Sequence, residues 1–119
     1  EQIKVEVVCN GANSLPRLKP AAEEAVYRIS QEALHNVVKH ARATRVEICI
    51  ESDNRELSLM IRDNGIGFDA SKVPAGHMGL GTMRQRAQAL GARYDMESKP
   101  GTGTTVNVAV PLDEWQLPR

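Results

Sequence analysis

Apolar and polar residues alternate along several short stretches of the chain, with the period of two that a half-buried strand requires. The clearest stretches are residues 3–7, 45–51 and 56–62, and residues 93–97 and 104–110 also favour strands. Residues 52–55, Ser-Asp-Asn-Arg, are typical of a hairpin connection. The sequence therefore predicts five strands, two of which form a hairpin.

Two other stretches follow the period of a helix. Between residues 20 and 42, six apolar residues fall on one broad arc: Ala22, Val26, Ile29, Ala33, Val37 and Ala41. Pro20 is tolerated at or just before a first turn, and Gly91 ends a shorter helix over residues 80–90. The order of elements predicts an α+β fold, a two-layer sandwich whose helices cover one face of a mixed, mainly antiparallel sheet.

Composition narrows the class of protein. The 119 residues, 41% hydrophobic and 25% charged, predict one globular domain over residues 1–119. Fifteen basic residues balance fifteen acidic ones, which argues against a nucleic-acid partner. No apolar run approaches the roughly 20 residues of a membrane span, so direct membrane insertion is not expected.

The first residue and the two cysteines bear on whether the chain is a fragment and on its cellular compartment. It begins at Glu1 without methionine, so we expect a fragment of a longer protein. Cys9 and Cys49 lie in apolar stretches, which favours buried reduced thiols of a cytosolic domain. A disulfide between the two cysteines is the alternative.

A polar stripe runs along the long predicted helix, beside its apolar arc. Glu32, Asn36 and His40 are spaced by four residues, and Lys39 lies three after Asn36. An amide oxygen is a hard ligand suited to Mg²⁺, and cations suit phosphate oxygens. The simpler alternative is an ordinary solvated flank.

Asp63 ends a predicted strand, and Gly65 and Gly67 follow it. Such a segment is usually a turn, but no strand follows at hairpin distance. Glycines allow the backbone to approach a flat group closely, and a carboxylate beside them can accept a hydrogen bond from an exocyclic amino group such as that of adenine.

Two further glycine-rich segments could hold an anion or a base. Residues 79–86, Gly-Leu-Gly-Thr-Met-Arg-Gln-Arg, open a helix with free N–H groups, and residues 101–105 contain two glycines and three threonines. Neither segment is a Walker A loop or a dinucleotide fingerprint. The alternatives are a plain helix start and a flexible hairpin loop.

Together these segments resemble the nucleotide-binding domain of the GHKL superfamily, which includes gyrase, Hsp90, histidine kinases and MutL. Residues 28–41 resemble the N box, 63–68 the G1 box, 79–86 the G2 box and 101–104 the terminal glycine–threonine motif. The likeness is greatest to sensor histidine kinases of the nitrate-sensor and DesK type. It implies a Bergerat-type fold.

The resemblance implies a role for each residue toward the base of ATP. Asp63 would accept from the adenine amino group, with a water shared with Thr104 or Thr105. Gly65 and Gly67 would make room for the purine. Residues 69–78 would form a short lid over the nucleotide.

The resemblance also implies the phosphate contacts. Asn36 would ligate Mg²⁺, and Lys39 and His40 would contact phosphate oxygens. The phosphate tail would lie at the helix start, on Gly79, Leu80 and Gly81. Glu32 occupies the place of the general base in hydrolytic relatives, and in a kinase it would polarise a metal-bound water or the attacking imidazole.

The implied activity is transfer of the ATP γ-phosphate to a histidine on an upstream dimerisation domain, and then to an aspartate of a response regulator. None of His35, His40 and His77 lies in a phosphoacceptor pattern, so we expect the target outside this chain. We expect a cytoplasmic domain, tethered to the membrane if at all through upstream regions. The alternatives are another GHKL ATPase, an anti-sigma serine kinase, or a non-catalytic module tuned by nucleotide.

Overall fold

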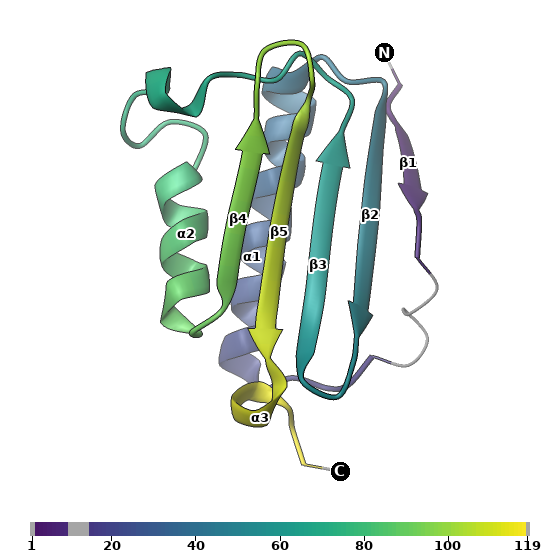
Figure 1. The fold of residues 1–119 in the computed structure, drawn as a ribbon, viewed down its shortest axis with the longest axis vertical. Helices are drawn as coiled ribbons and strands as arrows, with labels where there is room; N and C mark the ends of the chain where they lie inside the picture. The colour runs from purple at the N-terminus through teal and green to yellow at the C-terminus, as the bar shows by residue number, and fades with distance from the viewer. Residues whose placement is uncertain (1, 10–14, 119) are drawn as a thin grey trace.

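A computed structural model describes residues 2–9 and 15–118 of the 119-residue chain. Five strands form a single sheet, and their bounds are β1 Lys4–Val7, β2 Arg45–Ser52, β3 Glu56–Asp63, β4 Arg93–Ser98 and β5 Thr104–Pro111. The α-helices are α1 Pro20–Asn36, α2 Leu80–Ala89 and α3 Leu112–Trp115. A π-helical turn, Val37–Ala41, continues α1, and a 3₁₀ turn, Ala70–Lys72, lies before α2. Figure 1 shows this arrangement.

The strand order is β1-β2-β3-β5-β4, with β1 parallel to β2 and the other pairs antiparallel. The register turns Leu57, Leu59 and Ile61 of β3 toward the same face as Val106 and Val108 of β5, and all five side chains are buried. The mixed, mainly antiparallel sheet predicted from the sequence is confirmed.

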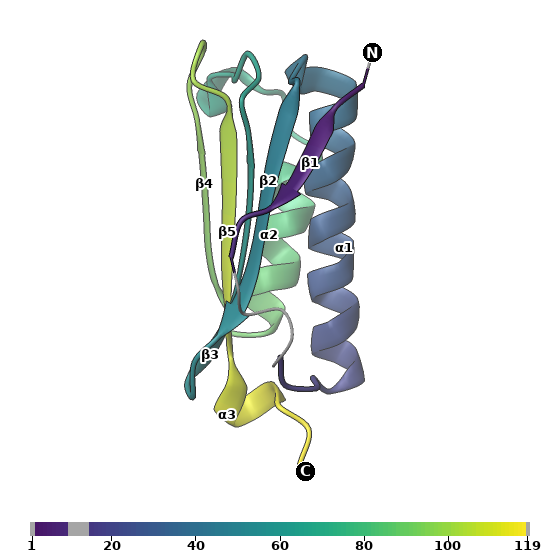
Figure 2. The ribbon, with the colours of Figure 1, turned by 90° about the vertical axis from the view of Figure 1, so that its right-hand side faces the viewer.

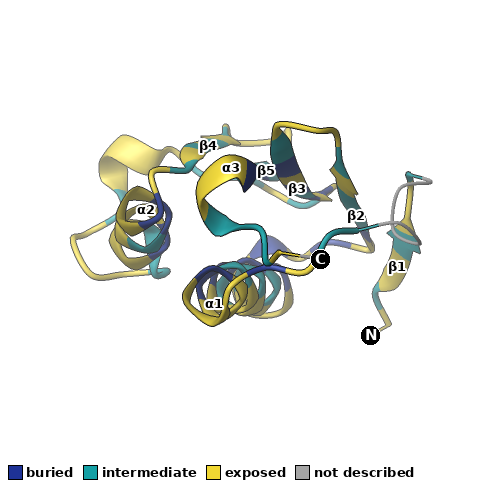
Figure 3. Cartoon of the chain, turned by 90° about the horizontal axis from the view of Figure 1, so that it is seen from below, coloured by how far each residue is buried: buried dark blue, intermediate teal, exposed yellow. Residues whose placement is uncertain are grey.

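Helices α1 and α2 cover this apolar face and leave the other face open, as Figure 2 shows. Helix α1 buries Ala22, Ala25, Ile29 and Ala33 against the sheet, while Met83 and Ala87 of α2 complete the core. Figure 3 shows that burial concentrates between the layers, with exposed residues on the outer sides of the helices. The two-layer α+β sandwich is therefore also confirmed.

The structure departs from the predicted elements at two places. The long helix does not continue regularly to residue 42, because its last five residues form the π-helical turn and Arg42 is left-handed, with φ 50°. Helix α3 was not predicted, since four residues carry too little periodicity. It is held by the indole N–H of Trp115, which donates to the carbonyl of Leu90 over 2.7 Å.

Cys9 and Cys49 form a disulfide, so the expectation of reduced thiols is wrong and the alternative holds. Parallel pairing of β1 with β2 matches Val7 with Ile48 and brings the two cysteines to a Cα–Cα distance of 5.3 Å. The 40 residues between them concealed this closeness in the sequence. Within residues 2–9 and 15–118, no helix has the length and apolarity to cross a membrane.

Candidate nucleotide-binding site

A cavity lies between the end of α1 and the sheet, close to the start of α2. Of the residues that the sequence predicted for a site, six line it: Asn36, His40, Asp63, Gly67, Leu80 and Thr104. Apolar side chains complete the wall, among them Phe68, Met78 and Met96. The cavity encloses about 30 Å³, far less than a purine ring fills, so entry of a base requires lining side chains to move apart.

Asp63 is a buried carboxylate at the end of β3, with 6% of its surface exposed. Its place follows from strand alternation, because Leu57, Leu59 and Ile61 turn to the same side. Burial raises the pKa of Asp63 above its ordinary value, while hydrogen bonds from the backbone of Gly65 and Thr104 oppose the rise. The Gly65 N–H donates to Asp63 Oδ1 over 2.7 Å.

The backbone around Asp63 is closely packed. At Gly103, where φ is +76°, an added Cβ would strike the carbonyl oxygen of Asp63. A Cβ added at Gly65 would likewise strike the carbonyl oxygen of Ala41. This oxygen also accepts a hydrogen bond from the N–H of Ile66 over 2.7 Å. The main chain that carries the carboxylate is therefore closely packed on two sides.

Two residues that the sequence analysis missed hold this region together. Asn64 Oδ1 accepts from the N–H groups of Thr44 and Arg45, both over 3.0 Å, which joins the end of β3 to the segment after α1. Ser98 Oγ accepts from the N–H of Phe68 over 2.9 Å and lies 2.8 Å from Thr104 Oγ1. The only sequence signal for Ser98 was its position at the end of a predicted strand.

Asn36 ends α1, immediately before the π-helical turn. Its Nδ2 donates to the carbonyl of Met78 over 2.7 Å, whereas its Oδ1 is buried and has no hydrogen-bond partner among the described residues. A buried polar atom without a partner is costly, and native proteins usually provide one. An amide oxygen is a suitable ligand for Mg²⁺, so the donor at this place fits the expected metal.

Gly79 caps α2 with φ +63°, and no side chain caps the start of this helix. A Cβ at Gly79 would strike the carboxylate of Glu32, which lies directly against it. Glu32 also lines a separate groove between α1 and α2, together with Arg28, Thr82 and Arg86. Glu32 therefore borders the helix start and does not line the cavity itself.

The remaining predicted residues lie outside the cavity lining. Lys39 is exposed on the π-helical turn, and Gly81 is exposed in the first turn of α2. Thr105 follows Thr104 on β5 and pairs with Arg62 and Glu97, so strand alternation turns it toward the open face. Of the two threonines expected near Asp63, the geometry favours Thr104.

The arrangement combines an apolar slot, a fixed carboxylate at one end, and amide, imidazole and helix-start groups at the other. Such a slot suits a flat ring with an amino group, and the helix start suits an anionic tail. The two ends of the site thus match the two parts of a nucleotide, its base and its phosphates.

The model of the family "Histidine kinase-, DNA gyrase B-, and HSP90-like ATPase" matches residues 21–114. The chain belongs to this family. All four motifs lie within the match, and the recognition made from them is confirmed.

Relatives within the family are identical to this chain at about a third of the aligned positions. It is 36% identical over 96 residues to the signal transduction histidine-protein kinase/phosphatase DegS of Brevibacillus brevis, covering 81% of this chain and 25% of that protein. It is 37% identical over 95 residues to the sensor histidine kinase LiaS of Bacillus subtilis, covering 80% and 26%. The chain thus spans about a quarter of the relatives that it matches.

Solved structures agree with the family fold. The histidine kinase domain of the blue-light activated histidine kinase of Erythrobacter litoralis superposes with a TM-score of 0.71 at 27% identity, covering 93% of this chain and 52% of that one. The ATP binding domain of PrrB from Mycobacterium tuberculosis gives 0.68 at 26% identity, covering 92% and 79%.

Proposed function

We propose that this domain binds ATP with Mg²⁺ and is the catalytic part of a two-component sensor histidine kinase. The observation that carries the proposal is the single cavity in which the buried carboxylate of Asp63 and the unpartnered amide oxygen of Asn36 face a common space. Kinship with DegS and LiaS supports the kinase branch of the family.

In this proposal Asp63 accepts the adenine amino group, helped by Thr104, and Gly65 and Gly67 border the purine. The apolar side chains of the cavity exclude water from the base. The Gly65 N–H holds the carboxylate, and the main chain of Asp63 is packed against Gly103, so the acceptor would discriminate adenine from guanine by its position.

The phosphates would extend toward the end of α1 and the start of α2. Asn36 would hold Mg²⁺, which when bound neutralises phosphate charge, while Lys39 and His40 contact phosphate oxygens. The first N–H groups of α2, at Leu80 and Gly81, would face the phosphate tail. Glu32, beside Gly79, is placed to orient the attacking group at that end.

Phosphoryl transfer depends mainly on positioning and charge neutralisation, which these groups supply. The acceptor would be a histidine of the dimerisation domain of the whole protein, and a response regulator would then receive the phosphoryl group. Because a kinase of this kind meets ATP and its response regulator in the cytoplasm, we place the domain on the cytoplasmic side. Any membrane tether would lie in other regions of the protein.

The decisive experiment supplies the acceptor separately. Calorimetry of the domain with ATP and GTP, with and without Mg²⁺, is followed by incubation with an isolated dimerisation and phosphoacceptor domain. We expect ATP to bind more tightly than GTP and to phosphorylate a histidine. Asn36→Ala should abolish the Mg²⁺-dependent transfer, and Asn107→Ala, on the open face, should not.

Other outcomes would identify the alternatives. Hydrolysis without transfer would favour a hydrolytic ATPase, and transfer to serine would favour an anti-sigma type of kinase. Failure to bind ATP at millimolar Mg²⁺ would favour an interaction module without catalysis.

A further inference from the structure

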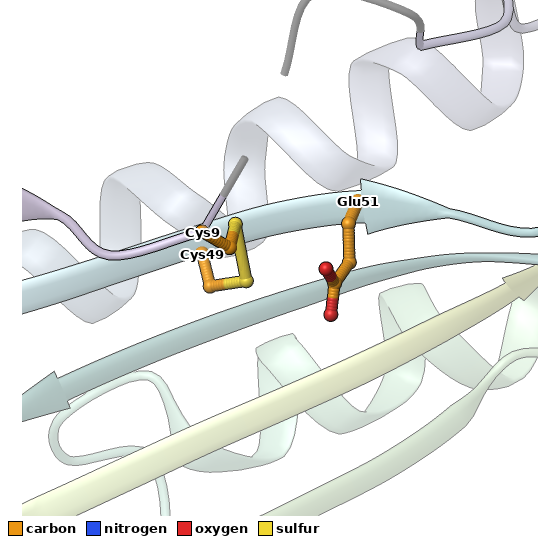
Figure 4. A group of neighbouring side chains, drawn as sticks. All are labelled: Cys9, Cys49 and Glu51. Atoms are coloured by element: carbon orange, nitrogen blue, oxygen red, sulfur yellow. A yellow bond between two sulfur atoms is a disulfide. The ribbon is translucent and has the colours of Figure 1, made fainter. Parts of the chain in front are cut away.

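Three metal-ligating side chains gather on the open face of the sheet, at its β1–β2 edge. Cys9 follows the end of β1, and Cys49 and Glu51 lie two residues apart on β2, so both point to one face. The two sulfurs and a carboxylate oxygen lie within 4.8 Å of one another. Figure 4 shows the disulfide and the Glu51 carboxylate on the same side of β2. The nucleotide cavity lies on the opposite face.

We propose that reduction of the Cys9–Cys49 disulfide opens a binding site for a soft divalent metal ion, Zn²⁺, held by both thiolates and the carboxylate of Glu51. Two equivalents of a thiol reductant break the S–S bond, giving two cysteine thiols and one disulfide of the reductant. Zn²⁺ then displaces two protons as it bonds to both sulfurs. Thiol–disulfide exchange with a disulfide oxidant re-forms the Cys9–Cys49 bond, converts the oxidant to two thiols and releases the ion.

The donor set favours this class of metal. Thiolates select Zn²⁺ over Mg²⁺ or Ca²⁺, and Zn²⁺ binds sulfur at about 2.3 Å and carboxylate oxygen at about 2.0–2.2 Å. In a tetrahedral site such ligands lie roughly 3.5–3.8 Å apart, which falls within the 4.8 Å that bounds this cluster, once the two bonded sulfurs have separated. Three protein ligands leave a fourth position for water or another molecule.

The local backbone allows the sulfurs to separate when the disulfide opens. Cys49 is fixed inside the sheet, where it is paired with Met60 of β3. Cys9 lies beyond the last residue of β1, after the N–H of Val8 donates to the carbonyl of Ile48 over 3.0 Å. Cys9 can therefore adjust toward a metal without breaking a strand.

The test titrates Co²⁺, a spectroscopic substitute for Zn²⁺, into the whole chain after anaerobic reduction with a phosphine and removal of the reductant. We expect a thiolate-to-cobalt charge-transfer band that saturates at one equivalent, is displaced by Zn²⁺ and is absent from the oxidised protein. Cys49→Ser should abolish the band. Glu51→Gln should weaken binding at least about tenfold, and Glu97→Gln, an exposed carboxylate on β4, should have no effect.

The proposal would be overturned by no band in the reduced protein, by equal binding in the oxidised protein, or by unchanged binding in Glu51→Gln. Circular dichroism accompanies the titration. If reduction unfolds the chain, recovery of the fold on adding Zn²⁺ supports the site, and failure to recover overturns it.

Discussion

The two ends of the nucleotide cavity are built in different ways. The sheet side, formed by Asp63, Gly65 and Gly103, is fixed by main-chain contacts. The helix side, formed by Asn36 and Gly79, rests on side chains, with one amide hydrogen bond to Met78 and one carboxylate packed against a glycine. The sheet side is thus already formed, while the helix side can rearrange.

This difference suits the two parts of a nucleotide. A base is recognised by hydrogen bonds at fixed positions, which a rigid backbone provides without reorganisation. The phosphate end must change as nucleotide enters and as phosphate leaves, and the hydrogen bond from Asn36 to the main-chain carbonyl of Met78 would open if that main chain moves. The π-helical turn also lies on this side, which is typical of functional sites.

The largest effect is expected on the sheet side, for Gly103→Ala. Its φ of +76° costs a side chain about 1–2 kcal/mol, and the collision with the Asp63 carbonyl adds about 1–3 kcal/mol. We expect the free energy of unfolding in denaturant to fall by the sum of both.

Gly76→Ala is the matched control for Gly103→Ala. Gly76 has a similar φ of +82°, but nothing lies near its added Cβ. The free energy of unfolding of Gly76→Ala should therefore fall only by the conformational cost of its positive φ. Equal losses in the two variants would show that the sheet side is not tightly packed.

Asp63→Asn separates binding from stability. Asn Oδ1 can still accept from the Gly65 N–H, but it cannot provide a charged acceptor for adenine. We expect ATP affinity to fall by about 1–3 kcal/mol in calorimetry, with the free energy of unfolding at neutral pH equal or higher. Unchanged ATP affinity would remove Asp63 from the recognition of adenine.

The pH dependence of Asp63 tests the same point in the wild-type chain. Because burial raises its pKa, the folded state holds this proton more tightly than the unfolded state. Its stabilising contribution is therefore present below the ordinary pKa of an aspartate and is lost as pH rises through the raised pKa. Between these two pKa values, the free energy of unfolding of the wild type should fall relative to that of Asp63→Asn as pH rises. Denaturation of both proteins at a series of pH values measures this difference.

On the helix side, Gly79→Ala should cost less than Gly103→Ala. Its φ of +63° is unfavourable for alanine, about 1–2 kcal/mol, but the atom it would strike belongs to the movable Glu32 side chain. Gly81→Ala is the control, with open space around its Cβ and a place inside α2, and should raise stability by about 0.5–1 kcal/mol.

A double-mutant cycle sharpens the Gly79 prediction. If the loss comes partly from displacement of Glu32, the change Glu32→Ala should recover part of it, and unfolding free energies would show the coupling. Strict additivity of the two changes would mean that the contact between Gly79 and Glu32 has no energetic weight.

Much of the fold was predictable because it follows from regular patterns. Alternation located the strands, the apolar arc located the face of α1, and the hairpin at 52–55 fixed one pairing. The parallel pairing of β1 was not predictable, since nothing local links residues 3–7 to residues 45–51. For the same reason the disulfide was only the alternative to the expected reduced thiols.

The site residues that belong to a recognisable sequence motif were predictable. Asp63 stood out because it ends a predicted strand before two glycines, and Asn36 because it lies in a polar stripe beside the apolar arc. Ser98 and Asn64 were missed because their roles arise from loops that meet only in the folded chain. Lys39 lies on the π-helical turn and does not line the cavity, and no residue pattern in the sequence predicted that turn.

The smallest effect is expected for Lys39→Ala. Lys39 is exposed and does not line the cavity, so its contact with a phosphate oxygen would be open to solvent and weakened by salt. We expect a loss of ATP affinity below about 1 kcal/mol at low salt, which vanishes at high salt.

Calorimetry of wild type and Lys39→Ala at two ionic strengths measures this difference. Lys72→Ala, another exposed lysine in the predicted lid, is the control for the general loss of a positive charge. A large loss that persists at high salt would mean that the helix side closes around the phosphates and buries Lys39. In that event this side would rearrange much further than the contacts of Asn36 alone require.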